Sequence, residues 1–153
     1  MNYIEAPTEY EGSEPALFLA GGVSDAENWQ RRLLRLLPRG EYAVLNPRRV
    51  TFPADDTAAE TQQIEWEVRH LRRAMLAVFW FPAHTLCPIT LLELGACWAA
   101  EKPIVVGADV AYARRFDVEI HLRLQRPDVT IADTLELLAT QVANCRELKD
   151  AFQ

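Results

Sequence analysis

The sequence predicts a single α/β domain in which helices cover both faces of a parallel sheet of about five strands. Short apolar runs recur along the chain, and each is followed by a stretch whose apolar residues have helical spacing. The length of 153 residues suits one domain, and 50% hydrophobic with 25% charged residues is an ordinary globular composition. Strands that alternate with helices form right-handed parallel βαβ units, so we expect a three-layer, doubly wound sheet.

The first half of the chain contains two strand patterns and two helix patterns. The apolar run at residues 16–20 ends at two glycines, which is typical of a buried strand that enters a tight turn. Asp25 is placed to cap a helix, and Ile64, Val68 and Leu71 would share one face of a later helix. We therefore expect a flexible tail over residues 1–15, strands over 16–20 and 42–45, and helices over 25–37 and 58–73, with a loop over 50–57.

The second half begins with the most apolar segment, residues 75–81, which has the continuous pattern of a central parallel strand. Pro82 ends this run, and Pro88 favours the start of a helix. We expect helices over residues 88–100, 117–124 and 133–148, of which the second is weaker. We expect strands over residues 103–106 and 129–131 and a short tail over residues 149–153. Without its two tails, the expected catalytic domain spans residues 16–148.

Charge and cysteine content exclude several classes of protein. The 16 Lys and Arg against 22 Asp and Glu give a net charge of -6, which repels a phosphate backbone, so nucleic acid is not an expected partner. The three cysteines form no metal or redox motif and indicate free thiols in a reducing compartment, so we expect a cytoplasmic protein. No apolar run approaches the ~20 residues of a membrane span, and the histidines suggest no metal or other cofactor.

The loop after the first expected strand contains Gly21, Gly22 and Asp25. In parallel α/β sheets the ligand crevice lies outside the carboxyl ends of the strands, so this loop is a candidate binding element. The glycines could let an anion approach backbone amides at the start of a helix. The alternative is a turn that needs a positive φ angle, followed by an ordinary helix cap.

Asn46, Arg48 and Arg49 follow the second expected strand. A guanidinium at this position can pair with a phosphate through two hydrogen bonds, which favours a nucleotide over a nucleoside. The alternative is a set of surface ion pairs with the acidic residues Asp55 and Asp56.

Glu93 is the most informative carboxylate. It follows Pro88 by five residues and therefore lies in the second turn of the helix that leaves the central strand, near the expected crevice. Its leucine neighbours would place the carboxylate against an apolar wall, which changes its pKa; the alternative is a glutamate on the helix surface. On the preceding helix, Glu65 and Glu67 lie on different sides, so one of them can face the crevice.

Aromatic side chains offer a way to hold a planar base. Trp66 and Phe81 are candidates for stacking, although Trp80 and Phe81 alternate along one strand and one of them is expected in the core. Cys87 and the nearby His84 form a weak candidate for a thiol–imidazole pair, because both lie on a short loop. A solvated helix face is expected for Arg69, Arg72 and Arg73.

Six segments in a fixed order carry a family resemblance: LFLAGG at 17–22, NPRR at 46–49, QQIEWE at 62–67, AVFWF at 77–81, ITLLELG at 89–95 and KPIVVG at 102–107. Over about residues 16–142 they resemble the nucleoside 2-deoxyribosyltransferase-like family. The resemblance implies a flavodoxin-like (Rossmann-like) sheet and a nucleophilic glutamate in the ELG segment, which is Glu93. It also implies an acidic residue on the preceding helix, which is Glu67, as the candidate acid/base.

The activity that the resemblance implies is transfer or hydrolysis of an N-glycosidic bond in a nucleoside or nucleotide, without a cofactor. A carboxylate stabilises the oxocarbenium-like state and can trap it covalently, while a second carboxyl protonates the departing base. A homodimer or larger homo-oligomer is also implied, with Asp117 near the interface. Phe18 and Cys87 stand where the family usually has tyrosine and aspartate. A nucleotide or NAD-like N-glycoside hydrolase and a catalytically silent ligand-binding domain therefore remain alternatives.

Overall fold

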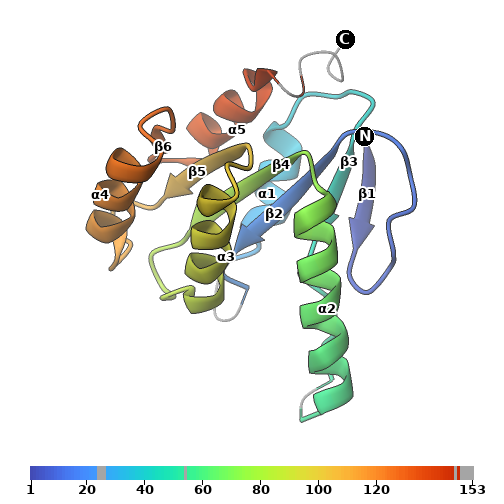
Figure 1. Ribbon diagram of the computed structural model, residues 1–153. Helices are drawn as coiled ribbons and strands as arrows, with labels where there is room; N and C mark the ends of the chain where they lie inside the picture. Colours follow the sequence, from blue (N-terminus) through green and yellow to red (C-terminus); the bar gives the residue numbers. More distant parts are fainter. Residues whose placement is uncertain (24–26, 54, 147, 149–153) are drawn as a thin grey trace.

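A six-stranded, wholly parallel sheet forms the centre of the computed structural model, which describes residues 1–23, 27–53, 55–146 and 148 (Figure 1). The strand order is β1-β3-β2-β4-β5-β6. In chain order the described elements are β1 Asn2–Glu5, β2 Ala16–Gly21, α1 Trp29–Leu36, β3 Ala43–Asn46, α2 Thr57–Arg73, β4 Leu76–Phe81, α3 Pro88–Ala99, β5 Ile104–Ala108, α4 Arg115–Gln125, β6 Ile131–Ala132 and α5 Leu135–Ala143.

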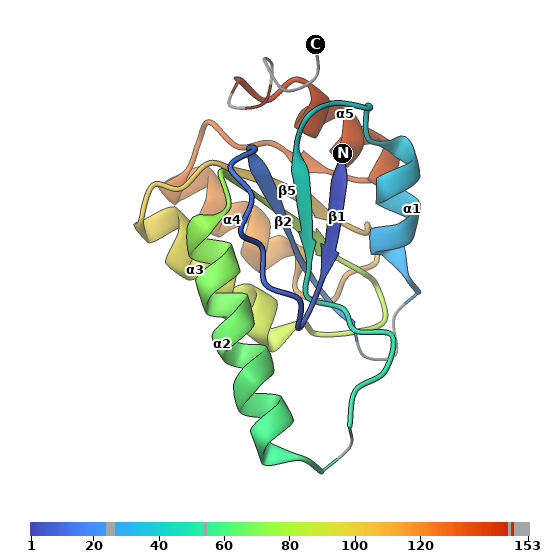
Figure 2. The same cartoon turned by 90° about the vertical axis from the view of Figure 1, so that its right-hand side faces the viewer.

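The helices form two outer layers, which confirms the expected three-layer α/β fold. Figure 2 shows the sheet between α1 and α5 on one side and α2 and α3 on the other. The core residues divide in the same way, because α2, α3 and α4 contribute to one buried cluster and α1 and α5 to the other. The chain order of the strands reverses between β2 and β4, and at such a switch point the loops at the carboxyl ends open a crevice.

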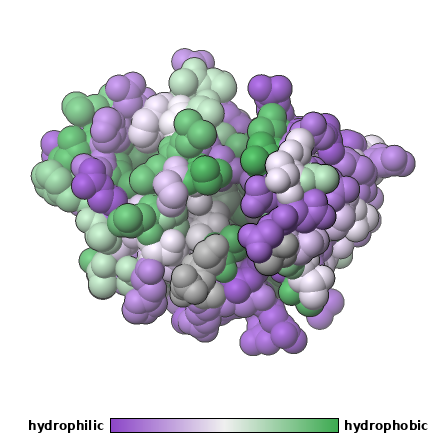
Figure 3. All heavy atoms as spheres, turned by 90° about the horizontal axis from the view of Figure 1, so that it is seen from below, coloured by the Kyte–Doolittle hydropathy of each residue, from purple (hydrophilic) through white to green (hydrophobic). Residues whose placement is uncertain are grey.

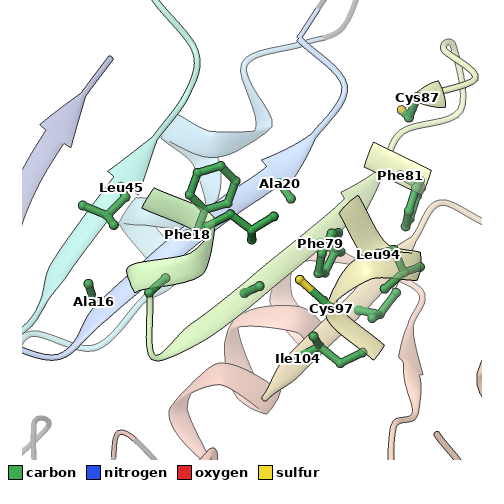
Figure 4. Close-up of a cluster of buried hydrophobic side chains, with 14 of the residues drawn as sticks. Ala16, Phe18, Ala20, Leu45, Phe79, Phe81, Cys87, Leu94, Cys97 and Ile104 are labelled. Carbon is green, nitrogen blue, oxygen red and sulfur yellow. The ribbon is translucent and has the colours of Figure 1, made fainter. Parts of the chain in front are cut away.

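Strand β4 explains why its sequence is apolar at every position. Phe79 and Phe81 belong to the core cluster beneath α2, α3 and α4, whereas Val78 and Trp80 belong to the cluster beneath α1 and α5. Successive side chains of a strand point to opposite faces, so a strand covered on both sides must be apolar throughout. Figure 4 shows the first of these clusters, with Phe79 beside Cys97 of α3.

The prediction that residues 1–15 form a flexible tail is wrong for β1, which adds a sixth strand. This strand pairs in parallel with β3, with Tyr3 opposite Val44. The residues that follow are held by α2: the Trp66 indole donates to the Thr8 carbonyl at 2.8 Å, and Tyr10 donates its backbone N–H to His70 Nε2 at 3.1 Å. The sequence does not reveal β1 because its four residues, NYIE, are exposed or only half-buried.

Helix α2 packs on a different face from the one that its apolar pattern predicted. Trp66, His70 and Leu71 are buried, whereas Ile64 is 60% exposed and Val68 is also exposed. The N-terminal half of α2 extends beyond the edge of the sheet, so its apolar side chains do not pack on the strands (Figure 1, Figure 2).

Arg69, Arg72 and Arg73 are all exposed, as expected, and two of them also bind the N-terminal segment. Arg69 forms an ion pair with Glu9 at 2.7 Å. Arg73 donates to the backbone carbonyls of Tyr10 and Gly12 and lies over the Tyr10 ring.

Helix α1 starts later than predicted. Its cap is Asn28, whose Oδ1 accepts from the Arg31 backbone N–H at 3.0 Å, and the predicted cap Asp25 lies outside the described residues. At the other end of the chain, α5 is shorter than the expected helix over residues 133–148. Within the described ranges, no helix is long and apolar enough to cross a membrane.

The anchoring of the N-terminal segment by α2 is testable. Trp66→Phe removes the indole donor to Thr8 and leaves the carbonyl without this partner, so the free energy of unfolding in urea should fall by about 1–2 kcal/mol. Ile64→Ala, at an exposed position of the same helix, should change it by less than about 0.5 kcal/mol. Equal effects of the two substitutions would show that the segment does not depend on Trp66.

Candidate active site

A cleft of about 650 Å³ lies outside the carboxyl edge of the sheet, at the end of β3, one strand away from the switch point between β2 and β4. The loop after β3 forms one wall, and the middle of α2 forms another. Its lining includes Asn46, Arg48, Arg49, Phe52, Gln63 and Glu67. The cleft is therefore built from the NPRR and QQIEWE segments, which come together from separate parts of the chain.

Asn46 shapes the wall of the cleft and uses its own side chain to do so. Its Oδ1 accepts from the Arg48 backbone N–H at 3.1 Å, which is the local bond that turns the chain after β3. Its Nδ2 donates to the hydroxyl of Tyr3 in β1 at 2.7 Å. With both groups engaged, Asn46 acts here as a support for the loop, and the predicted contact with a ligand remains untested.

The two arginines differ in their partners. Arg48 Nη1 donates to the Glu27 carbonyl and to Gln30 Oε1, both at 3.2 Å, which joins the loop to the start of α1. Arg49 Nη2 donates to Gln62 Oε1 at 3.1 Å, and its guanidinium lies 5.5 Å from the centre of the Phe52 ring. Across the described residues neither arginine forms the ion pair with the acidic loop that the sequence left open.

Gln63 connects the loop to the carboxylate of Glu67. Its Nε2 donates to the Pro47 carbonyl at 2.8 Å and to Glu67 Oε1 at 2.7 Å, one turn further along α2. Burial raises the pKa of Glu67, while the hydrogen bond from Gln63 and the positive charge of Arg49 partly oppose this increase. Glu67 is thus a half-buried carboxyl group on the wall of the cleft.

Glu93 is a second half-buried carboxyl group, on the neighbouring helix α3. Burial, followed by the negative charge of Glu67, raises the pKa of Glu93 to about 8. The two glutamates predicted as catalytic are therefore brought within electrostatic range of each other, although Glu93 is not among the residues that line the cleft. The negative charge of Glu67 thus adds to burial in favouring the protonated form of Glu93.

A family model confirms the resemblance suggested by the motifs. The model for nucleoside 2-deoxyribosyltransferase-like proteins matches residues 14–111, which is more than half of the chain. The chain belongs to this family. The match runs from the residues just before β2 to the turn after β5 and includes both glutamates. A comparison with curated proteins found no match.

In this member of the nucleoside 2-deoxyribosyltransferase-like family, the aromatic residues predicted to stack on a base are in the core. Trp66 is fully buried and stacks on His70 at a ring distance of 3.9 Å. Phe81 is fully buried and packs against Tyr112 at 5.1 Å, and Trp80 is buried as well. These predictions are wrong because neither the apolar run that contains Phe81 nor the two glutamates that flank Trp66 show whether a ring faces the core or a cleft.

Phe52 is an aromatic side chain at the cleft that the sequence reasoning missed. It is 45% exposed and contacts Arg49 through the face of its ring. Its position on the long loop after the second strand was the available signal, because exposed aromatic residues on loops near strand ends often contact ligands.

Gly21 and Gly22 are required by packing. Neither glycine has a positive φ angle, which rules out the alternative of a strained turn. A Cβ atom on Gly21 would lie 2.5 Å from the Trp80 carbonyl, and one on Gly22 would lie 2.5 Å from Thr85 Cγ2. The close approach of strand β4 and of the Trp29 ring explains Gly21, and that of the loop after β4 explains Gly22; neither glycine lines the cleft.

Cys87 has a structural position at the start of α3. It is buried in a left-handed conformation with a φ angle of 49°, and burial raises the pKa of its thiol, which opposes a role as a nucleophile. Of the other candidate ligands, His70 is buried beneath the N-terminal segment, and His121 stacks on Trp98. Among the described residues, no group of three or more His, Cys, Asp or Glu side chains could hold a metal ion.

The coupling of the two carboxyl groups can be measured directly. Glu67→Gln removes the negative charge that contributes to the raised pKa of Glu93, so this pKa should fall below about 8 but stay above its ordinary value because burial remains. Titration of the side-chain carboxyl carbons by ¹³C NMR gives the value. Glu65→Gln, at an exposed position of the same helix, should leave the pKa of Glu93 unchanged; a fall there too would contradict a specific coupling.

The raised pKa of Glu93 also predicts a pH-dependent stability. The folded state binds this proton more tightly than the unfolded chain does, so stability falls as pH rises from about 4.5 to about 8. Glu93→Gln should therefore stabilise the protein near pH 9, by about 1 kcal/mol or more, and have little effect near pH 4. Urea unfolding at both pH values measures the difference, and an equal change at both would mean that titration of Glu93 is not its cause.

Proposed function

We propose that this chain transfers or hydrolyses the N-glycosidic bond of a nucleoside or nucleotide by means of Glu93 and Glu67. The observation that carries the proposal is the coupled, half-buried carboxyl pair beside a cleft at the carboxyl edge of the sheet. Two carboxyl groups whose environments separate their pKa values can supply one proton donor and one carboxylate at the same pH. Membership of the nucleoside 2-deoxyribosyltransferase-like family supports the bond type.

The proposed reaction has two displacement steps. In the first, a Glu93 oxygen forms a bond to the anomeric carbon, the bond from this carbon to the base nitrogen breaks, and the base takes its electron pair together with a proton from Glu67. In the second, a new base or water attacks the same carbon and gives its proton to Glu67, while the bond between this carbon and Glu93 breaks. Two inversions at one carbon give overall retention of configuration. The acceptor decides between transfer and hydrolysis.

The two departures from the family pattern do not alter the lining of the cleft. Phe18, in the position usual for tyrosine, is fully buried and tilts against Trp66 at 6.2 Å. Cys87, near the position usual for aspartate, is also buried. Because neither side chain lines the cleft, these departures do not count against an active enzyme. Arg48 and Arg49 in the cleft favour a nucleotide or NAD-like ligand among the alternatives.

Analysis of the released or exchanged bases tests which bond is cleaved and what the two glutamates do. Incubation with nucleosides, their monophosphates and NAD, with and without a free base, should release or exchange the base. Glu67→Gln should lower the rate about 10²–10⁴-fold on these substrates but much less on a 4-nitrophenyl riboside, whose leaving group needs no proton. Glu93→Gln should abolish turnover of both kinds. If the native protein cleaves none of these N-ribosides, the enzyme proposal fails.

A trapped intermediate identifies the nucleophile. A 2-fluoro-arabinosyl nucleoside slows both steps because the fluorine disfavours positive charge at the anomeric carbon, so the glycosyl-enzyme should accumulate. Mass spectrometry of the digested protein should find the sugar on the peptide that contains Glu93. A sugar on Glu67, which lines the cleft, would reverse the two roles and keep the reaction type.

We further propose a homo-oligomer in a reducing compartment such as the cytoplasm, in keeping with the buried thiols of Cys87 and Cys97. Seen from below, apolar surface gathers over the α3 and α4 side of the molecule (Figure 3). Exposed apolar side chains at the starts of these helices are Leu86, Ile89, Leu92, Val110 and Phe116. Asp117, proposed to lie near the interface, forms an ion pair with Arg114 at 3.2 Å in this region.

A charge in this apolar region should prevent association. Phe116 is 73% exposed, so Phe116→Glu should not disturb the fold of the single chain but should shift the mass measured by light scattering toward the monomer. Leu137→Glu, at an exposed position on α5, is the control. An unchanged mass for Phe116→Glu would place any interface elsewhere.

A further inference from the structure

Buried polar atoms without a partner gather around the cleft. Within the part of the chain that the structure describes there are three such atoms: Gln30 Nε2, Arg49 Nε and Gln63 Oε1. Arg49 and Gln63 line the cleft, and the amide of Gln30 accepts from Arg48, which also lines it. Folded proteins satisfy nearly all buried polar groups, so unpaired atoms concentrated at one cleft indicate where a ligand supplies the missing partners.

Gln63 presents an acceptor. The orientation of its amide is fixed, because only the NH₂ group can donate both to the Pro47 carbonyl and to Glu67 Oε1. Oε1 is therefore an unpaired acceptor close to the carboxylate that the proposed reaction uses as acid and base. A sugar hydroxyl can donate to it, whereas a phosphate dianion cannot.

Arg49 presents a donor and a positive charge. Its Nη2 is bonded to Gln62 and its ring contact is with Phe52, but the buried Nε has no partner. Its charge acts on Glu67, yet no ion pair within 4.0 Å joins these two described residues. An anionic oxygen beside Arg49 would satisfy both the unpaired donor and the unpaired charge.

We propose that the cleft binds the sugar-phosphate part of a nucleoside 5′-monophosphate, with the phosphate on Arg49 and a sugar hydroxyl on Gln63. This inference rests on the proposed function and makes its substrate a nucleotide. A ligand with hydroxyl donors at one end and anionic acceptors at the other offers a donor to Gln63 Oε1 and an acceptor to Arg49 Nε. The cleft volume of about 650 Å³ lies within the usual range for small-molecule sites.

Binding of ribose 5-phosphate tests the proposal without any turnover, because this sugar phosphate is common to nucleotides with different bases. Isothermal titration calorimetry on the full chain should give tighter binding for ribose 5-phosphate than for ribose or for inorganic phosphate. Arg49→Met should weaken ribose 5-phosphate by at least about tenfold and leave ribose unchanged, because it removes a charge-assisted hydrogen bond. Gln63→Met should weaken both sugars.

Arg72→Met is the matched control, because Arg72 is exposed on α2 and does not line the cleft. Far-ultraviolet circular dichroism shows whether each variant keeps its fold. A second control is Arg49→Lys, which keeps the charge, so its affinity for inorganic phosphate should remain near that of the native protein. Equal binding of ribose and ribose 5-phosphate by the native protein, or equal effects of Arg49→Met and Arg72→Met, would overturn the proposal.

The failure of this proposal and that of the proposed function give different results. If the protein binds ribose 5-phosphate through Arg49 but cleaves no nucleotide, the ligand assignment stands and the enzymatic function fails. If it cleaves nucleosides as fast as their monophosphates and does not bind ribose 5-phosphate, the function stands and the phosphate assignment is wrong.

Discussion

The packing of α2 against the sheet determines the position of the cleft, because this one helix carries both the buried residues that hold it in place and the polar residues that form a wall of the cleft. Trp66 and His70 are buried one turn apart and fix the helix on the sheet and on the N-terminal segment. Gln63 and Glu67 are spaced in the same way along the helix and are held against the loop after β3. A rotation of α2 that exposed Trp66 would therefore also separate the carboxyl group of Glu67 from the loop.

The sequence predicts the elements that are buried on both faces more reliably than the surfaces that border the cleft. Strand β4 and its neighbours were found because both of their faces meet helices and every residue is apolar. Strand β1 was missed because its pairing with β3 depends on backbone hydrogen bonds, and its side chains stay partly exposed. Propensity and periodicity carry little information about such an edge strand.

The difference between fully buried and partly exposed positions also explains which residues of the candidate site can be predicted from the sequence. Arg48 and Arg49 could be predicted because they follow a strand end, where a parallel sheet opens its crevice, and Glu67 because the family resemblance implies an acidic residue on this helix. Trp66 and Phe81 were misplaced because sequence alone does not show which side of an element faces solvent. Phe52 and the role of Gln63 became visible only when the loop after β3 and helix α2 were brought together.

Recognition of an anion and the position of the catalytic proton are physically linked in this site. In the free protein burial raises the pKa of both glutamates. The hydrogen bond from Gln63 and the charge of Arg49 partly oppose this increase in Glu67, whereas the charge of Glu67 adds to it in Glu93, which favours the proton on Glu93. The proposed reaction needs the reverse, with the proton on Glu67 and the charge on Glu93. A phosphate on Arg49 would cancel the charge that favours ionised Glu67 and would thereby raise its pKa. Because the charge of Arg49 acts on Glu67, while the pKa of Glu93 is set by burial and by Glu67, the bound anion would favour the proton position that the first displacement requires.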